Sequence, residues 1–251
     1  MNKISIVIPV FNEENFIGKL LNHLHEKASK ETQLEIIVVD GGSTDKTRDI
    51  VKEFKTTYNL KRKDTETSSG LPCDTLKLMA SVKGRAKQMN FGAKEANGNI
   101  LYFLHADSFP PPNFDKLIIE QIENGHEAGC FRMKFDYQHW WLRLAGCLTI
   151  LPWKMCRGGD QSIFITTSLF QDIGGFNENY MVYEDMDIIS KIYKRTPFKV
   201  IPKWLTTSAR CYKKHGIWKT QYYFFRIYLK KWLGASPDEL QHYYQRTVLK
   251  F

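Results

Sequence analysis

The stretch "NILYFLHADSF" (residues 99–109) decides the fold class of this chain. Its unbroken apolar run, Ile100 to Leu104, is typical of a strand that is buried on both faces, as in a parallel sheet covered by helices. The run stops shortly before Asp107, which follows His105 by two positions. Because ligands of open α/β sheets bind at the carboxyl ends of the strands, a carboxylate at this point indicates a metal or phosphate site.

The first half of the chain alternates strand patterns with helix patterns, which is typical of a parallel sheet built by right-handed crossovers. Strands are expected at residues 4–11, 34–40, 75–81 and 100–104, and helices at 14–28, 43–54 and 84–98. Ser43 or Thr44 is expected to cap the second helix, and Gly98 to close the third. The polar stretch 57–74 contains Gly and Pro and is expected to be a loop.

The second half departs from strict alternation. Its strands are expected at residues 127–137, 161–168, 198–202 and 206–212, and its helices at 139–154 and 184–195. The helix at 184–195 has an acidic first turn, which its dipole favours. Basic helices are expected to end the chain, and the whole pattern predicts an α/β fold.

The composition indicates one catalytic-sized unit. The chain has 251 residues, 43% of them hydrophobic and 25% charged, which is enough for one sizeable core. Its five cysteines are scattered and odd in number, which favours a reducing compartment over a disulfide framework. The first apolar stretch is too short for a signal peptide, and no window is long enough to span a bilayer. We therefore expect a cytoplasmic protein, soluble or peripheral on the inner face of the membrane.

The net charge of +9 is concentrated at one end. Residues 203–251 hold ten Lys or Arg against Asp238 and Glu239, so this tail alone carries +8. Because the charge is confined to the tail, a nucleic-acid groove along the body is not expected. The segment "WKTQYYFFRIYLKKWL" (218–233) places aromatic residues at helical spacing between basic ones. This pattern fits a helix in a lipid headgroup layer and equally a helix packed on the core.

Four polar motifs follow one another along the chain. They are "SIVIPVFNEENFIGKLL" (5–21), "IIVVDGGSTDKT" (36–47), "GRAKQMNFGAKEANGNILYFLHAD" (84–107) and "GGFNENYMVYEDMDIISKI" (174–192). In this order they resemble family 2 glycosyltransferases of the GT-A fold over about residues 4–195. Within that family the chain most resembles a bacterial subgroup with "HAD" and "GGDQ" motifs, some of whose members are linked to arsenosugar biosynthesis.

The resemblance implies a Rossmann-like, mostly parallel sheet flanked by helices. It implies a GT-A domain over residues 1–211, with a nucleotide-binding half at 1–107, an acceptor half at 108–211, and a helical extension at 212–251. The implied activity is an inverting, metal-dependent transfer of a sugar from a nucleotide-diphosphate donor to a hydroxyl group. The acceptor is left open between a small molecule and a lipid-linked molecule.

The resemblance also places the donor-binding residues. They are Pro9, Asn12, Glu13, Asp40, Arg85, Asn90, His105 and Asp107. Asp107 is placed to hold Mn²⁺ or Mg²⁺ against the diphosphate, with His105 and His215 as further candidate ligands. The family usually has a carboxylate where His105 stands and a second Asp where Gly41 stands, so both positions depart from its pattern.

Several of these residues also have structural explanations. His105 fits a core histidine about as well as a donor or metal contact. Asn12 fits an Asx turn, and Arg85 fits an exposed helix face. Asp40 as a mere helix cap is disfavoured, because Ser43 and Thr44 are better placed for that role.

An inverting transfer needs a base that takes the proton of the attacking hydroxyl group. By resemblance Asp185 is this base. The neighbouring Glu184 is expected to orient the acceptor, or to raise the pKa of Asp185 through the proximity of a like charge. For Asp187 the stabilisation of its own helix is the preferred explanation. Asp160 and Gln161 are expected to contact the acceptor, although a tight turn before a strand explains "GGDQ" as well.

Two other functions compete with this one. A nucleotidyltransferase would carry a Gly-rich, basic loop after the first strand, and "PVFNEEN" (9–15) has none. A non-catalytic protein that binds a nucleotide sugar or a membrane surface would not need the intact "ED" pair and Asp107. A dinucleotide-dependent dehydrogenase is disfavoured because no GxGxxG motif follows the first strand.

Overall fold

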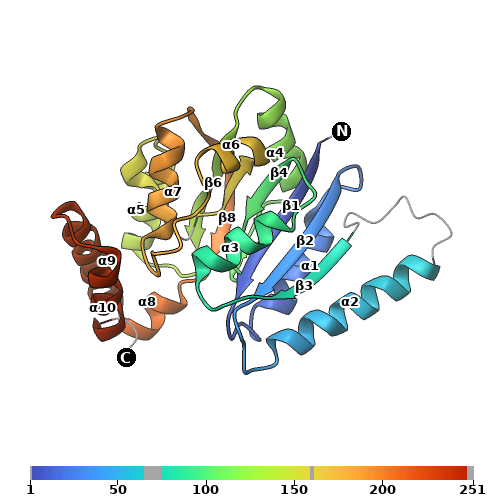
Figure 1. The fold of residues 1–251 in the computed structure, drawn as a ribbon, viewed down its shortest axis with the longest axis horizontal. Helices are drawn as coiled ribbons and strands as arrows, with labels where there is room; N and C mark the ends of the chain where they lie inside the picture. Colours follow the sequence, from blue (N-terminus) through green and yellow to red (C-terminus); the bar gives the residue numbers. More distant parts are fainter. Residues whose placement is uncertain (1, 65–74, 159–160, 248–251) are drawn as a thin grey trace.

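The computed structural model describes residues 2–64, 75–158 and 161–247. Its centre is one twisted sheet with helices around it (Figure 1). The eight strands of this sheet lie in the order β3-β2-β1-β4-β7-β6-β8-β5. The strands are β1 (Lys3–Val10), β2 (Gln33–Asp40), β3 (Thr75–Ala80), β4 (Ile100–Phe103), β5 (Ser108–Phe109), β6 (Ala128–Phe135), β7 (Ile163–Thr166) and β8 (Phe198–Thr207). The sheet is mixed and mostly parallel, as the sequence predicts.

Helices cover both faces of this sheet. They are α1 (Ile17–Lys27), α2 (Thr47–Asp64), α3 (Arg85–Lys94), α4 (Phe114–Glu123), α5 (Trp140–Leu148), α6 (Thr167–Asp172), α7 (Glu184–Tyr193), α8 (Arg210–His215), α9 (Ile217–Trp232) and α10 (Pro237–Thr247), with a 3-10 turn η1 (Lys154–Cys156). The apolar side chains of α1, α2 and α4 join one core with Ile4, Ile6 and Ile8 of β1. Those of α3, α6 and α7 join a second core with Val7 on the other face. The alternation along β1 therefore separates two apolar layers.

The parallel strands bring three loops to one edge of the sheet. Val10 pairs with Asp40 across β1 and β2, and Val7 pairs with Phe103 across β1 and β4. The chain continues these ladders beyond the strands, because the Leu104 amide donates to the Val7 carbonyl. The segments after β1, β2 and β4 thus begin at neighbouring points, where α/β folds bind ligands.

The antiparallel strands of the second half add a fourth segment at this edge. In the β5–β8 pair, Ser108 lies opposite Thr207. The Ser208 amide then donates to the Asp107 carbonyl at 3.2 Å. As a result, the start of α8 lies beside the "HAD" segment, although about a hundred residues separate them in the sequence.

The last two helices form a hairpin at the periphery of the molecule, beside α7 and α8 (Figure 1). A small core of Tyr180, Ile227 and Leu240 attaches them, with Tyr183 and Phe224 packed around it. Within the described ranges, no helix is both long enough and apolar enough to cross a bilayer.

Several predicted element boundaries are wrong. Helix α2 continues to Asp64, so the loop expected at 57–74 starts too early; residues 65–74 lie outside the described ranges. The sequence of residues 60–63 is Leu-Lys-Arg-Lys, all of them good helix formers. Helix α3 ends at Lys94, and Gly98 does not close it. A Cβ at Gly98 would lie 2.7 Å from the Lys3 carbonyl oxygen, so the glycine allows close strand contact.

The second half differs from expectation in four places. The strands expected at 198–202 and 206–212 are one strand, β8, and a helix, α8. The Ser208 hydroxyl accepts the Arg210 amide at 3.2 Å in the turn that leads from β8 into this helix, whose N-cap is Ala209. The helix expected at 139–154 ends at Leu148, and the strand expected at 161–168 becomes α6 from Thr167. Helix α4 lies where the sequence analysis assigned no element.

Candidate active site

Asn12 joins the loop after β1 to the loop after β2. Its backbone amide donates to Ser43 Oγ at 2.9 Å, and its side-chain Oδ1 accepts the Thr44 backbone amide at 2.9 Å. Asn12 has a φ of 56°, a left-handed conformation that asparagine tolerates better than most residues. Ser43 and Thr44 therefore do not cap α2; the Asp45 carboxylate accepts the Thr47 amide there instead. Asn12 fixes the shape of the predicted donor site.

Asp40 is buried at the end of β2 and holds its own loop. Its carboxylate accepts the amides of Gly42 and Ser43 at 3.2 Å, and Arg48 lies 3.8 Å from it. A Cβ at Gly41 would lie 3.0 Å from Gln88, whose amide group donates to the carbonyls of Val10 and Val39. The glycine that replaces the family's second Asp therefore makes room for a buried glutamine that joins two strand ends.

Asp107 follows β4, as the sequence predicts, and its partner is an arginine that the sequence analysis did not single out. Arg210 Nε lies 3.1 Å from Asp107 Oδ2. The same guanidinium donates from Nη1 and Nη2 to the two oxygens of Glu13, both at 2.6 Å. One cation therefore joins the carboxylates at the ends of β1 and β4.

The described residues contain no group of three or more His, Cys, Asp or Glu that could hold a metal ion. The structure thus does not gather His105, Asp107 and His215 into a metal cluster, and the roles of the two histidines stay predictions. His105 is half-buried beside Asp107, and His215 ends α8. Asp107 as a single protein ligand fits a cation that is bound jointly with donor phosphates, because Mg²⁺ is commonly held by one or two carboxylates and the substrate.

The "ED" pair lies at the first turn of α7 and contacts Arg85 at the first turn of α3. Arg85 Nη1 lies 3.0 Å from Glu184 Oε1 and 3.5 Å from Asp185 Oδ2. Both acids are almost completely buried, whereas the Arg85 side chain is half-exposed. Burial raises the pKa of Glu184 above its usual value, although the Arg85 guanidinium lowers it. Tyr183, with a φ of 81°, turns the chain into this helix.

A cleft of about 350 Å³ opens beside these acids. Its walls combine polar groups with apolar side chains; they include Arg85, Glu184, Asp185, Met133, Leu148, Met155, Phe224 and Tyr228. Gly158 and Arg157 also line it, and Arg157 is buried with its Nη2 donating to the Thr149 carbonyl at 2.6 Å. The cleft can admit an acceptor to Asp185.

The residues predicted to contact the acceptor are only partly described. Asp160 lies outside the described residues. Gln161 is buried, and its Oε1 accepts the Gly158 amide at 3.2 Å, so it is held to a residue of the cleft wall. An acceptor role for Gln161 stays a prediction.

Asn90 forms hydrogen bonds with other residues of this chain. Its amide donates to the Phe176 carbonyl and to Glu178, both at 2.9 Å, and its Oδ1 accepts the Phe176 amide. It therefore attaches α3 to the loop before α7. Pro9 lies in β1, one residue before its end, and pairs with Val39 of β2. Donor contacts of these two residues stay predictions.

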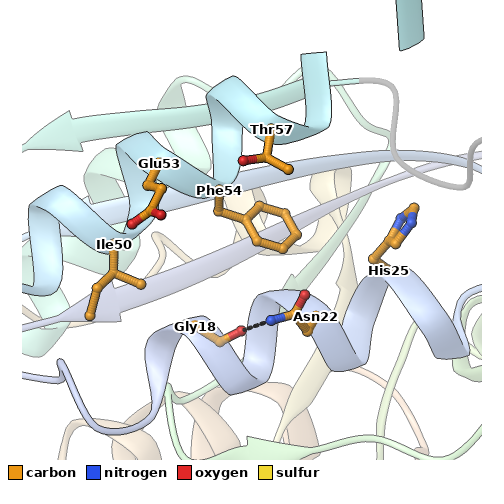
Figure 2. A pocket seen from close by; sticks show the side chains of 7 residues that line it. All are labelled: Gly18, Asn22, His25, Ile50, Glu53, Phe54 and Thr57. Carbon is orange, nitrogen blue, oxygen red and sulfur yellow. Dashed lines mark hydrogen bonds between the residues drawn. The ribbon is translucent and has the colours of Figure 1, made fainter. Parts of the chain in front are cut away.

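A second, smaller pocket of about 250 Å³ lies between α1 and α2 (Figure 2). It is lined by Gly18, Asn22, His25, Ile50, Glu53, Phe54 and Thr57. The view shows Phe54 and Ile50 pointing from α2 toward α1, where Asn22 donates to the Gly18 carbonyl at 2.9 Å. None of the predicted site residues lines it, and the catalytic candidates all lie elsewhere.

Sequence comparison identifies glycosyltransferases as relatives of this chain. A model of the family "Glycosyl transferase family 2" matches residues 5–176. The poly(ribitol-phosphate) beta-N-acetylglucosaminyltransferase TarS of Staphylococcus aureus is 34% identical over 109 residues, 43% of this chain and 17% of TarS. The probable glycosyltransferase YdaM of Bacillus subtilis is 27% identical over 206 residues, 76% of this chain and 46% of YdaM. The chain thus spans less than half the length of these two relatives.

Solved structures with the same fold include two with nucleotide sugars. The mannosyltransferase PcManGT of Pyrobaculum calidifontis, in complex with GDP-Man and Mn²⁺, has a TM-score of 0.65 at 16% identity and covers 94% of this chain and 65% of its own. TarS in complex with UDP-GlcNAc has a TM-score of 0.58 at 21% identity and covers 83% and 59%. At these identities the likeness establishes the fold, which is GT-A-like.

Proposed function

This chain belongs to glycosyltransferase family 2, and we propose that it transfers a sugar from a nucleotide-diphosphate donor to an acceptor hydroxyl group, with inversion at the anomeric carbon. The observation that carries the proposal is the convergence of two acidic sites at one edge of the sheet. Asp107 and Glu13 form one of them, and Glu184 and Asp185 form the other. An inverting transfer needs a group that stabilises the negative charge of the leaving diphosphate, and a base that takes the proton of the acceptor hydroxyl.

The donor would lie over the loops after β1, β2 and β4. Asp107 would hold a divalent cation, Mn²⁺ or Mg²⁺, which would offset the negative charge that develops on the departing diphosphate. Support comes from the position of Asp107 at a strand end and from PcManGT, whose structure contains Mn²⁺ with GDP-Man. The residues of this chain do not identify the nucleobase or the sugar of the donor.

Asp185 is the proposed general base. The acceptor oxygen forms a bond to the anomeric carbon as the bond from that carbon to the diphosphate oxygen breaks, and the bonding electron pair leaves with the diphosphate. The acceptor proton passes to an Asp185 carboxylate oxygen. Arg85, 3.5 Å from Asp185 and 3.0 Å from Glu184, holds both acids at the cleft. Glu184 is a positioning residue in this scheme, because it is buried behind that contact.

The acceptor would enter through the cleft beside Asp185. The proposal keeps a nucleotide-binding half at 1–107, an acceptor half at 108–211 and a helical extension at 212–251, although Arg210 of the second half reaches the donor side. Asp160 and Gln161 are proposed to contact the acceptor. Membership of the subgroup with "HAD" (105–107) and "GGDQ" (158–161) motifs is part of the proposal and rests on those motifs alone.

We further propose that the C-terminal helices contact an anionic membrane surface. Helix α9 packs through Ile227, while Trp218 is 58% and Trp232 is 81% exposed. The aromatic stripe is therefore mainly on the outer face of α9, which weakens the alternative that it packs on the core. Trp218 also contacts Trp140 of α5, which is 60% exposed, so the exposed aromatic face continues onto α5. A lipid-linked acceptor would reach Asp185 from such a surface.

Vesicle co-sedimentation tests the membrane proposal. Each Lys or Arg near an anionic leaflet contributes about 1 kcal/mol of binding free energy, so binding to phosphatidylglycerol vesicles should occur at low salt and be lost at high salt. Trp232→Ser should weaken binding, while Trp204→Ser, an exposed tryptophan on β8, should not. The absence of sedimentation at low salt would favour a small-molecule acceptor.

A thermal-shift screen tests the donor proposal. The protein is mixed with UDP, GDP, ADP, CDP or dTDP, each with and without Mn²⁺. A nucleotide at a hundredfold excess over its Kd adds about 2.7 kcal/mol to the unfolding free energy, which raises the Tm by about 5–10 °C for a domain of this size. A shift with one base, enhanced by Mn²⁺, is expected. No shift with any of them would contradict the proposal.

A further inference from the structure

Arg210 is the residue of the donor site that carries an inference beyond the proposed function. It is the first residue of α8, yet its guanidinium contacts two acids that lie 197 and 103 positions earlier in the chain. Both nitrogens of its fork donate to Glu13 at 2.6 Å, and its Nε lies 3.1 Å from Asp107 Oδ2. A planar fork of this kind binds carboxylates and phosphates in the same bidentate way.

The position of Arg210 is fixed by its surroundings. The Ser208 amide donates to the Asp107 carbonyl, and the Arg210 amide donates to Ser208 Oγ at 3.2 Å. The Ala209 amide donates to Asp136 Oδ1 at 2.8 Å, which holds the turn from the other side. The guanidinium carbon lies 4.9 Å from the centre of the Phe16 ring, within the range of a cation–π contact. Backbone and ring contacts therefore place this arginine at the "HAD" segment.

The charges of the site explain why a fixed cation is useful there. Glu13 and Asp107 together carry two negative charges, and a nucleotide diphosphate that approaches them is itself an anion. Arg210 neutralises one of the two charges. Burial acts to lower the pKa of Arg210, but its hydrogen bonds with Glu13 and the charge of Asp107 raise it. The side chain is thus a cation at neutral pH.

We propose that Arg210 binds the donor diphosphate. In the donor-free protein its fork is held by Glu13; when the donor binds, the fork turns from Glu13 to the phosphate oxygens, while Asp107 becomes available to the divalent cation. During transfer the guanidinium stabilises the negative charge of the leaving diphosphate. This inference rests on the proposed function, because it assumes a nucleotide-diphosphate donor at this edge of the sheet.

Calorimetric titration in EDTA isolates Arg210 from any metal. UDP and GDP are titrated into the wild type, Arg210→Gln, Arg210→Lys and Lys213→Gln, with uridine and guanosine as probes that lack phosphate. Lys213 is the matched control, since it lies on the same helix but is paired with Asp136 at 3.3 Å. Urea unfolding of each variant verifies that it is folded.

Arg210→Gln should weaken diphosphate binding by about tenfold to a hundredfold, because it removes charged hydrogen bonds to phosphate. Its nucleoside affinity should not change. Arg210→Lys should show an intermediate loss, since lysine keeps the charge but not the fork. Lys213→Gln should bind within about twofold of the wild type, as expected for a surface charge away from the ligand.

One result would overturn the inference. It is an Arg210→Gln variant that is folded and binds the diphosphate as tightly as the wild type or more tightly, which would leave Arg210 as a structural ion pair. A wild type that binds neither diphosphate, with or without Mn²⁺, would instead refute the proposed function itself.

Discussion

Glu35 of β2 offers a prediction whose size can be worked out from the structure. It is fully buried in the sheet, at the end opposite the active site. Its Oε1 lies 2.7 Å from Lys77 Nζ and accepts from Asn97 Nδ2 at 2.8 Å. Its Oε2 accepts from Ser5 Oγ at 2.6 Å and from the Asn97 amide at 2.8 Å. One carboxylate thus joins β1, β2, β3 and the segment before β4.

These contacts make the protein more stable when Glu35 is ionised. Burial acts to raise the pKa of Glu35, but hydrogen bonds from Asn97, Lys77 and Ser5 lower it from 4.5 to about 2. At about 1.4 kcal/mol per pKa unit, this difference stabilises the fold by about 3 kcal/mol at neutral pH. The value is an upper limit, because Lys77 is one-third exposed and water screens part of its charge. The stabilisation is present above pH 4.5 and is lost as the pH falls toward 2.

Urea unfolding of the wild type and Glu35→Gln, followed by circular dichroism between pH 7 and pH 3, measures this term. The variant should be less stable by up to about 3 kcal/mol at pH 7 and by about half as much at pH 3, where the unfolded wild type binds a proton that the folded one does not. Glu26→Gln on the exposed side of α1 is the control and should change stability by less than about 0.5 kcal/mol. A difference between wild type and Glu35→Gln that stays constant over this pH range would refute the charge argument.

Two further variants test the site. Asp107→Ala should bind nucleoside diphosphate with its dependence on Mn²⁺ abolished, as measured by calorimetry with and without the metal; an undiminished dependence would exclude Asp107 as the cation ligand. Arg85→Met should lower the unfolding free energy by about 1–3 kcal/mol, because it leaves Glu184 buried without its cation. Since burial raises the pKa of Glu184, protonation relieves this cost, and urea unfolding should show a larger loss at pH 8 than at pH 5. An equal loss of unfolding free energy at pH 5 and pH 8 would contradict the argument that Arg85 compensates the buried charge of Glu184.

The parts of the site that sequence reasoning found are those encoded by a local pattern. Asp40 and Asp107 end apolar runs, and the "ED" pair begins a helix, so each could be placed at a strand end or a helix start before any contact was known. The parallel alternation of the first half then brings these positions to one edge of the sheet. The general arrangement of the donor side follows from that rule.

The parts that sequence reasoning missed depend on contacts between distant segments. The sequence pattern predicts a strand at Arg210 and indicates no role for it beyond the charge of the tail. Its pairing with Glu13 follows from the β5–β8 pair, which places α8 beside Asp107. Glu35 lies inside a strand pattern that predicts nothing about its three partner residues, Ser5, Lys77 and Asn97. Gln88 is a similar case, because its position under Gly41 depends on how α3 packs over two strand ends.

The central claim is that Asp185 activates an acceptor hydroxyl against a nucleotide-diphosphate sugar, and donor turnover tests it most directly. Proton NMR follows a donor panel that includes UDP-Glc, UDP-GlcNAc and GDP-Man with Mn²⁺, and reports both the release of sugar to water and its anomeric configuration. We expect release with inversion for one donor, and a rate about 10²- to 10⁴-fold lower for Asp185→Asn, which should still bind the donor. Release with retention, or an Asp185→Asn variant with near-normal turnover of that donor, would contradict the account.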